Sequence, residues 1–510
     1  MSAIAPALKV RAPQRRGIGF WMSRVLAEAA HATRELSPDA VHDLRVALRR
    51  CRTLADTMGE LDAHPAWQEM DAAARRLFRR LGPLRDADVM AGWLEKVAPA
   101  EDLVRQALEA QLLAERDAHR RRAQRALRRF DRAEWRGLRQ VLVRRAGRVP
   151  AGGAVFQHLA LERWTEARAL HSAALRTRSA VALHRLRVGL KRLRYIVENC
   201  LPKLHVAWGG DLKQFQDWLG EIHDLDVLRA ALPGTGLLDG AAKKRWHSWL
   251  ESPRGERLSK YRERMGGRKP LWPQWRAALP AGRAEQKVCK ARWEAWALFQ
   301  GSARRHLRRV ARISSGLLRG LKRARFAEHF ADPAAERILA VASLVHAAGR
   351  ASGKRGHHKT AYRLIRGLRP PLGWTPEETR QVALVARYHR GKPPAAHHEG
   401  FAELDETQRA QVCALAGVLR IAEALATAVA LETRTPRVRV SRMHDVLLVR
   451  VSGLHLDEQN AARLARRKML LETLLELSIV VTREEGKPQL IPAAVNPADP
   501  GGGTPATPSA

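Results

Sequence analysis

The hydrophobic and polar positions of the chain follow a helical period along most of its length. Between residues 40 and 58, for example, apolar side chains recur every three or four positions, and charged side chains fill the positions between them. This spacing gathers the apolar side chains on one face of an α-helix. The same pattern prevails over most of residues 18–490, and the sequence therefore predicts an all-α protein.

Three segments rich in Pro and Gly interrupt the helical pattern and predict turns between helices. They are residues 148–154, 233–240 and 266–273. An alternating, β-like pattern appears near the C-terminus, in residues 437–440 and 446–451, with Met443 to Asp445 as the expected turn. We therefore expect a small β-hairpin there.

The two ends of the chain lack the helical pattern. Residues 1–17 are basic and residues 491–510 are rich in Pro, Gly and Thr, which predicts a flexible arm and a disordered tail. The N-terminus has no continuous apolar stretch of the kind found in secretory signals. No apolar run reaches the ~20 residues needed to cross a bilayer. We expect a cytoplasmic protein without a membrane span.

The charge of the chain changes this picture most. The sequence holds 91 Lys and Arg against 52 Asp and Glu, a formal net charge of +39. Residues 116–148 alone contain thirteen arginines and three acids. Such a surface repels itself unless it meets a polyanion. DNA, RNA, an anionic membrane and polyphosphate all satisfy this requirement.

The four cysteines exclude two classes of protein. They are Cys51, Cys200, Cys289 and Cys413. Because they lie far apart and form no C-x-x-C pair, the sequence predicts neither a structural zinc site nor a secreted disulfide framework.

An internal repeat divides the first part of the chain into two halves. The run His42-Asp-Leu-Arg-Val-Ala-Leu-Arg-Arg-Cys-Arg aligns without a gap with His184-Arg-Leu-Arg-Val-Gly-Leu-Lys-Arg-Leu-Arg. A second motif follows each at a similar interval, Leu81-Gly-Pro-Leu-Arg-Asp-Ala-Asp and Leu219-Gly-Glu-Ile-His-Asp-Leu-Asp. Two motifs repeated in the same order indicate a duplicated helical unit, with halves at about residues 18–150 and 151–290.

The first motif places its basic side chains on one face of a helix. At ~100° per residue, the four residues that begin with His42 fall within a stripe about 80° wide. They are His42, Arg45, Arg49 and Arg52. The corresponding residues of the second half are His184, Arg187, Lys191 and Arg194. Leu44, Leu48 and Cys51 lie on the opposite, apolar face. We add the adjacent Arg50 and Arg192 to the candidate ligands.

Two such helices that face each other form a basic cleft. Successive cations lie one turn apart, ~5 Å along the axis, which is comparable to the spacing of charges on a polyphosphate chain. An arginine fork bonds two phosphate oxygens at once, and many contacts to one polymer add through counterion release. The alternative is a solvated charged face without a ligand. The repetition of the same stripe favours the cleft.

The second motif contributes two pairs of acids. They are Asp86 and Asp88, and Asp224 and Asp226. An Asp-x-Asp pair is compatible with metal binding, but we favour the interpretation that these acids hold the Arg and His residues of the cleft in position.

These repeated motifs resemble the CHAD family of histidine-marked α-helical domains. The resemblance covers residues 18–290 and implies two pseudo-symmetric four-helix bundles around a basic cavity that binds polyphosphate. The resemblance implies that the His, Arg and Lys residues of the two stripes bind the polyphosphate. Many members of the family also carry a triphosphatase domain rich in E-x-E-x-K. That motif is missing here, so its activity is not implied.

Residues 293–490 resemble a second family, the HD-type helical domain at the C-terminal side of exopolyphosphatases and guanosine-pentaphosphate phosphohydrolases. The matching stretches surround His346, His357 and His358, His389, and residues 419–425. The hairpin and the last helix fit the same family. No actin-like ATPase domain, which carries the chemistry of those enzymes, precedes this part of the chain.

An active HD site needs His ligands and an Asp that holds a metal ion. Here the central dyad reads His346-Ala347, and Glu423 takes the late Asp position. Weak candidates for a divalent metal site are His306, His346, His358, His389 and Glu423. In the favoured interpretation there is no cofactor, and these residues are relics or bind anions together with Lys359, Arg387 and Arg390.

The sequence thus predicts a polyphosphate-binding adaptor or granule-associated protein that is not an enzyme. One alternative is a metal-dependent phosphohydrolase that acts on polyphosphate or a nucleotide through the HD-like domain. Nucleic acid is expected to bind only non-specifically, because the sequence contains no zinc finger, RNP aromatic motif or clear helix-turn-helix. The oligomeric state is left open.

Overall fold

The computed structural model describes residues 17–177, 179–326, 328–350, 353, 356–430, 432–433 and 435–484. The predicted tail and all of the predicted basic arm except Gly17 lie outside these residues. The chain divides into two compact units, residues 1–292 and 293–510. We call them the N-terminal and the C-terminal unit.

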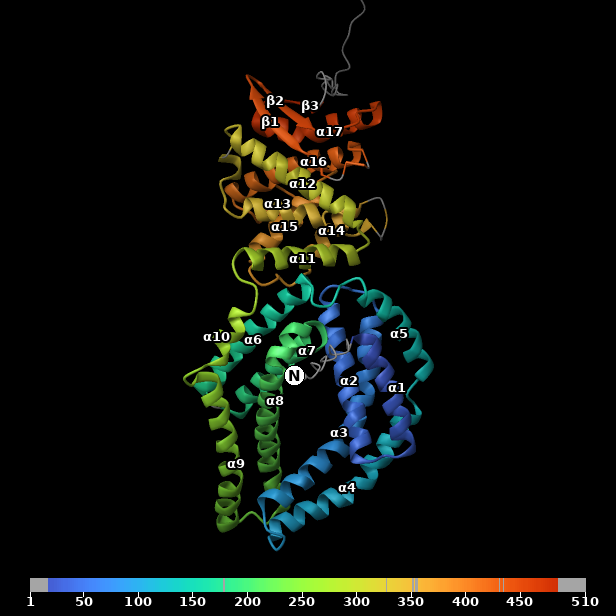
Figure 1. Ribbon diagram of the computed structural model, residues 1–510, viewed down its shortest axis with the longest axis vertical. Coiled ribbons are helices and arrows are strands. Elements are labelled where there is room, and N and C mark those ends of the chain that lie inside the picture. The colour runs from blue at the N-terminus through green and yellow to red at the C-terminus, as the bar shows by residue number, and fades with distance from the viewer. Residues whose placement is uncertain are drawn as a thin grey trace, which may run out of the picture. The chain divides into compact units, whose positions relative to one another are not determined.

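The N-terminal unit consists of two similar helical halves (Figure 1). The first half contains α1 (Ile18–Arg34), α2 (Pro38–Gly59), α3 (Ala66–Val97), α4 (Leu103–Arg128) and α5 (Arg132–Ala146). The second contains α6 (Ala154–Thr177), α7 (Ala180–Cys200), α8 (Pro202–Ala231), the 3-10 helix η1 (Leu232–Thr235), α9 (Gly240–Gly266) and α10 (Leu271–Ala277). Helices α1–α4 and α6–α9 pack on their neighbours in sequence. The predicted pair of four-helix bundles is confirmed.

The two motif helices, α2 and α7, begin in the same way. Ser37 accepts a hydrogen bond from the backbone N–H of Ala40, at 3.3 Å, and Ser179 accepts one from Ala182, at 3.2 Å. A serine at this position satisfies one of the unpaired N–H groups of the first turn. Both caps lie five residues before the motif histidine, so the repeat includes the signal that starts the helix.

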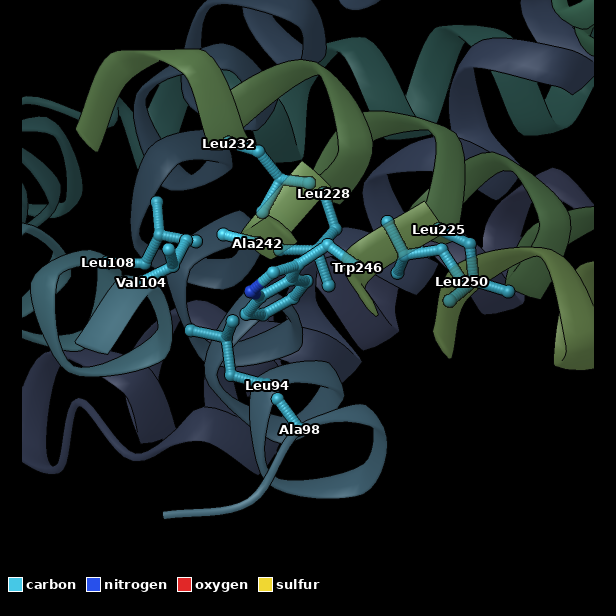
Figure 2. Packing of buried hydrophobic residues seen from close by; sticks show 10 residues of the cluster. All are labelled: Leu94, Ala98, Val104, Leu108, Leu225, Leu228, Leu232, Ala242, Trp246 and Leu250. Atoms are coloured by element: carbon cyan, nitrogen blue, oxygen red, sulfur yellow. The ribbon is translucent and has the colours of Figure 1, made fainter. Parts of the chain in front are cut away.

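The halves are joined by a hydrophobic cluster and by buried polar contacts. Figure 2 shows the cluster, in which Leu94 of α3 and Leu108 of α4 approach Leu228 of α8 and the fully buried Trp246 of α9. The polar contacts include a hydrogen bond of 3.0 Å between Trp21 Nε1 and Asn199 Oδ1. These contacts fix the two copies of the repeat against each other.

The C-terminal unit is built around one apolar helix. Helix α11 (Arg283–Phe299) leads into it, followed by α12 (Arg304–Arg323), the 3-10 helix η2 (Glu328–Phe330), α13 (Ala335–Val345), α14 (His357–Arg366), α15 (Pro376–Tyr388), α16 (Glu406–Ala428) and α17 (Glu458–Leu475). Helix α16 contacts α12, α13, α15 and α17. It is the one described helix that is long and apolar enough to cross a membrane, but 78% of its apolar window is buried by its neighbours. It therefore forms the core of this unit.

The predicted hairpin is present, and a third strand that was not predicted extends it to a three-stranded sheet. Strands β1 (Val438–Met443) and β2 (Val446–Val451) pair antiparallel, and β3 (Ser478–Arg483) adds to β2 in parallel. The sequence analysis missed β3, although its β-branched run of Ile479, Val480 and Val481 is typical of a strand. A parallel pair requires a long crossover, which α17 provides, so no local turn signal marks this pairing.

Candidate functional site

Helices α2 and α7 pack against each other across the two halves. Leu44, Leu48 and Cys51 on the predicted apolar face of α2 are fully buried. The basic stripes of α2 and α7 lie at the junction, where a cavity of about 530 Å³ is lined by Arg49 and Arg52 from α2 and by Lys191 and Arg192 from α7. The structure thus brings together basic residues that are about 140 positions apart in the sequence.

Arg45 and Arg187 occupy equivalent places in the two halves. Arg45 donates a hydrogen bond to the carbonyl of Phe78, at 3.0 Å, and lies 3.8 Å from Asp86. A Cβ at Gly82 would lie 3.3 Å from its guanidinium, and a Cβ at Gly220 would lie 3.9 Å from that of Arg187. Gly82 therefore gives Arg45 room to lie along the adjacent helix, whereas at Gly220 a Cβ would make only an ordinary contact with Arg187.

The acids of the second motif have two different roles. Asp86 and Asp224 lie beside the arginines of the cleft, Arg45 and Arg187 respectively. Asp226 instead binds Arg254 of α9, at 2.9 Å. Burial raises the pKa of Asp224, and Arg187 opposes that shift. These carboxylates thus offset part of the positive charge and position the helices.

His42 and His184 are exposed at the start of the two stripes. Burial lowers the pKa of His42, and Arg85 lowers it further. Burial, Arg187 and Lys191 likewise lower the pKa of His184, whose ring lies 4.7 Å from that of His223. Burial and the neighbouring cations thus disfavour the protonated form of both imidazoles.

Three cations of the two stripes have no acidic partner within ion-pair distance in the part of the chain that the structure describes. They are Arg49, Arg187 and Lys191. The Nε of Arg187 is buried without a hydrogen-bond partner. Burial lowers the pKa of Lys191 to about 7, and Arg49, Arg187, Arg45 and Arg194 add to the shift. Like charges from both halves are thus held together against their mutual repulsion, an arrangement that an anion stabilises.

Four of the five weak metal candidates in the C-terminal unit are histidines whose rings lie near one another. The ring centroids of His306 and His346 are 5.8 Å apart, those of His346 and His389 4.9 Å, and those of His389 and His358 6.4 Å. His346 and His389 are fully buried, and their Nδ1 atoms donate to the carbonyls of Ser343, at 2.9 Å, and Ala386, at 2.6 Å. Burial lowers the pKa of His346 to about 3, so the ring is neutral. The Nε2 atoms of both rings have no hydrogen-bond partner. The structure shows no group that uses them.

His306 and Glu423 also line an open cavity of about 780 Å³. The carboxylate of Glu423 lies 3.3 Å from Arg350. The described residues contain no group of three or more His, Cys, Asp or Glu side chains that could hold a metal ion. The histidine rings lie close together, but Ala347 stands at the dyad position and Glu423 lies beside Arg350, so no carboxylate completes a metal site among the described residues.

Residues 22–233 match the family described as the CHAD domain. The matched CHAD region lies within the N-terminal unit. Residues 303–482 match domain III of the Ppx/GppA phosphatases. Both resemblances drawn from the motifs are thus confirmed, and the chain is a fusion of these two modules.

A structure search found the CHAD domain from the plant Ricinus communis. It is 24% identical in sequence, the match covers 56% of this chain and 97% of that chain, and the TM-score is 0.36. No curated protein matched the chain.

One candidate residue of the CHAD domain requires correction. Arg50 was grouped with the ligands, but the structure buries it, with its guanidinium 2.6 Å from Glu198 and stacked 4.4 Å from the ring of Tyr195. It lies about 100° around the helix from Arg49, and this turn directs it toward the other half. Arg50 therefore joins the two halves. Arg192 lines the cleft, although it is also paired with Glu166, at 3.1 Å.

The outer cations of the stripes are held by residues that the sequence analysis missed. Arg52 binds Asp71, at 3.0 Å, while Arg194 donates to Gln216 and lies 3.4 Å from Glu198. The ring of Phe78 lies under Arg45, 4.2 Å from its guanidinium, and near Arg49 and Arg52, both at 5.6 Å. Phe78 and Gln216 each precede the Leu-Gly of the second motif by three residues. Their shared position is the signal that could have identified them.

Proposed function

We propose that the protein binds inorganic polyphosphate in the cleft between α2 and α7 and acts as an adaptor. The observation that carries this proposal is the set of three stripe cations, Arg49, Arg187 and Lys191, which have no acidic partner at ion-pair distance within the described chain. A linear polyanion neutralises all three at once, and it reaches the outer arginines at a spacing of about one helical turn.

This function agrees with the family of each module. The CHAD match and the Ppx/GppA match both fit a role connected with polyphosphate. We do not propose the phosphohydrolase alternative, because Glu423 is paired with Arg350 and the dyad position holds Ala347. A cytoplasmic location on polyphosphate granules belongs to the proposal, and imaging of the tagged protein with a polyphosphate stain tests it.

The decisive experiment compares two pairs of charge reversals in the full chain. Arg45→Glu with Arg187→Glu alters the cleft. Arg121→Glu with Arg128→Glu makes the same change in charge on α4, where both residues are exposed. Affinity for long-chain polyphosphate is measured at about 0.2 M salt, where diffuse surface attraction is screened.

We expect the cleft pair to weaken binding by about a hundredfold and the α4 pair by a few-fold at most. Equal losses would contradict the cleft and favour a diffuse positive surface. Competition with duplex DNA under the same conditions separates polyphosphate from a general preference for nucleic acid. Phosphate release with and without Mn²⁺, measured in the same samples, tests the enzyme alternative directly.

A further inference from the structure

The C-terminal unit contains a second concentration of positive charge. The cavity of about 780 Å³ is lined by six arginines, two histidines and a single acid, Glu423. Arg350 follows α13, Arg390 follows α15, and Arg463 and Arg467 lie on α17. Separate elements of the unit thus direct guanidinium groups toward one cavity, which two of the five weak metal candidates, His306 and Glu423, also line.

Repulsion among these like charges lowers the stability of the folded C-terminal unit. Arg463 and Arg467 are four residues apart on one helix, where like charges repel. Burial lowers the pKa of Arg467, and although Glu423 raises it, Arg390 and Arg463 lower it further. The first turn of α12 contributes Arg305 and His306 and contains no acid, although the helix dipole disfavours cations there. A bound anion offsets each of these costs.

The arginines of the cavity divide into structural and ligand-facing groups. Arg309 donates to the carbonyls of Val429, at 3.0 Å, and Ala426, at 3.4 Å, so it closes the C-terminal end of α16. Glu423 lies 3.3 Å from Arg350 and leaves most of the remaining charge unbalanced. Arg467 donates to the carbonyl of His389, at 3.4 Å. The groups available to a ligand are therefore chiefly Arg390 and Arg463.

We propose that this cavity is a second anion site, which binds a compact oligophosphate of a few phosphate units. Several arginine forks suit phosphate oxygens, since each bonds two of them. The lining contains no Phe, Tyr or Trp on which a nucleotide base could stack. The ligand is therefore the phosphate group itself, and a nucleoside attached to it adds no affinity. Because the site lies in the C-terminal unit, this inference does not depend on the CHAD cleft.

The experiment uses tripolyphosphate and the full chain with Arg45→Glu and Arg187→Glu, so that the cleft does not contribute. Binding is measured by isothermal titration calorimetry at about 0.2 M salt. Arg463→Gln and Arg390→Gln each remove one ligand-facing cation. Arg466→Gln is the matched control, because Arg466 is exposed on the same helix and does not line the cavity.

We expect one tripolyphosphate per chain, with Kd raised about tenfold or more by Arg463→Gln and by Arg390→Gln, and less than about twofold by Arg466→Gln. Circular dichroism checks that each variant is folded. Absence of binding in the cleft background, or equal effects of the three variants, would overturn the site. ATP binding no tighter than tripolyphosphate is the expected result. Binding of ATP at least tenfold tighter would overturn the assignment of the ligand to free oligophosphate.

Discussion

At the scale of single residues, Lys191 shows how closely the cleft brings like charges together. Its ammonium is surrounded by Arg49, Arg187, Arg45 and Arg194, and burial together with these charges lowers its pKa to about 7. A cation in this position destabilises the folded protein, and the polyphosphate that we propose as the ligand offsets this cost. Stability and binding should therefore respond in opposite directions when it is removed.

We predict that Lys191→Met raises the melting temperature while it weakens polyphosphate binding. Removal of the crowded charge should stabilise the N-terminal unit by about 1 kcal/mol or more, which is roughly 2–4 °C in Tm. Scanning calorimetry and a binding isotherm measure the two effects. A fall in both stability and affinity would mean that Lys191 is a packing residue.

Lys191 also predicts the pH dependence of binding. In the free protein its pKa is about 7, well below the ordinary value of 10.5, so the side chain is largely neutral at pH 8. A polyanion favours the ammonium form and raises this pKa, so the complex takes up a proton. Affinity should therefore fall as pH rises above about 7, by no more than about tenfold per pH unit.

Calorimetry in two buffers of different ionisation enthalpy measures this proton uptake. Lys191→Arg keeps the charge but does not titrate in this range, so the uptake near pH 8 should disappear in that variant. Uptake that persists in Lys191→Arg would assign the proton to another group.

The two motif glycines provide a matched pair of substitutions. At Gly82 a Cβ would press on the Arg45 guanidinium at 3.3 Å, whereas at Gly220 it would meet Arg187 at an ordinary contact distance of 3.9 Å. Alanine stabilises a helix interior by about 1 kcal/mol relative to glycine, so both variants should melt at higher temperature. We predict that only Gly82→Ala also weakens polyphosphate binding, by a few-fold. Equal affinities of the two variants would mean that the Arg45 side chain adapts.

At the scale of elements, the cleft requires that helices of the two halves keep a fixed position relative to each other. The cluster around Trp246 joins α3 and α4 to α8 and α9 (Figure 2). Trp246 is fully buried, and its Nε1 donates to Asp102, the N-cap of α4, at 3.1 Å. One side chain therefore packs the interface and supports the start of a helix in the other half.

We predict that Trp246→Ala destabilises the N-terminal unit by about 3–5 kcal/mol, since it leaves a large cavity and removes a hydrogen bond to Asp102. Trp249→Ala is the control, because Trp249 is only partly buried beside the same cluster. Chemical denaturation followed by circular dichroism measures both. A loss from Trp249→Ala as large as that from Trp246→Ala would show that the cluster does not centre on Trp246.

At the scale of the whole molecule, the chain contains two compact units that match two unrelated families. Each has its own hydrophobic core, so we expect separate unfolding transitions in scanning calorimetry. Trp246→Ala should lower one transition and thereby assign it to the CHAD domain. The other transition should remain at its original temperature.

Long-chain polyphosphate should then raise the CHAD transition. A ligand at a hundred times its Kd stabilises its domain by about 2.7 kcal/mol. The shift should vanish in the Arg45→Glu, Arg187→Glu variant. A shift that survives this double substitution would place the main polyphosphate site elsewhere.

The sequence by itself determined the repeated helices, their buried faces and most of their basic stripes. These features depend on the local period of a helix, which the order of residues specifies directly. The stripe of α2 could therefore be predicted from His42 to Arg52, and that of α7 from His184 to Arg194. The match between the two halves added the support that a single charged helix lacks.

Only the tertiary structure decided which cations are free to meet a ligand, because ion pairs form between segments that are distant in sequence. Arg50 is paired with Glu198, 148 residues away, whereas its neighbour Arg49 remains without an acidic partner at ion-pair distance among the described residues. Strand β3 finds β2 only across α17. In the C-terminal unit, His306 and Arg467 line one cavity from helices at opposite ends of that domain's sequence. The helical period depends on residues that are neighbours in the sequence, whereas tertiary packing decides which acid pairs with a given cation.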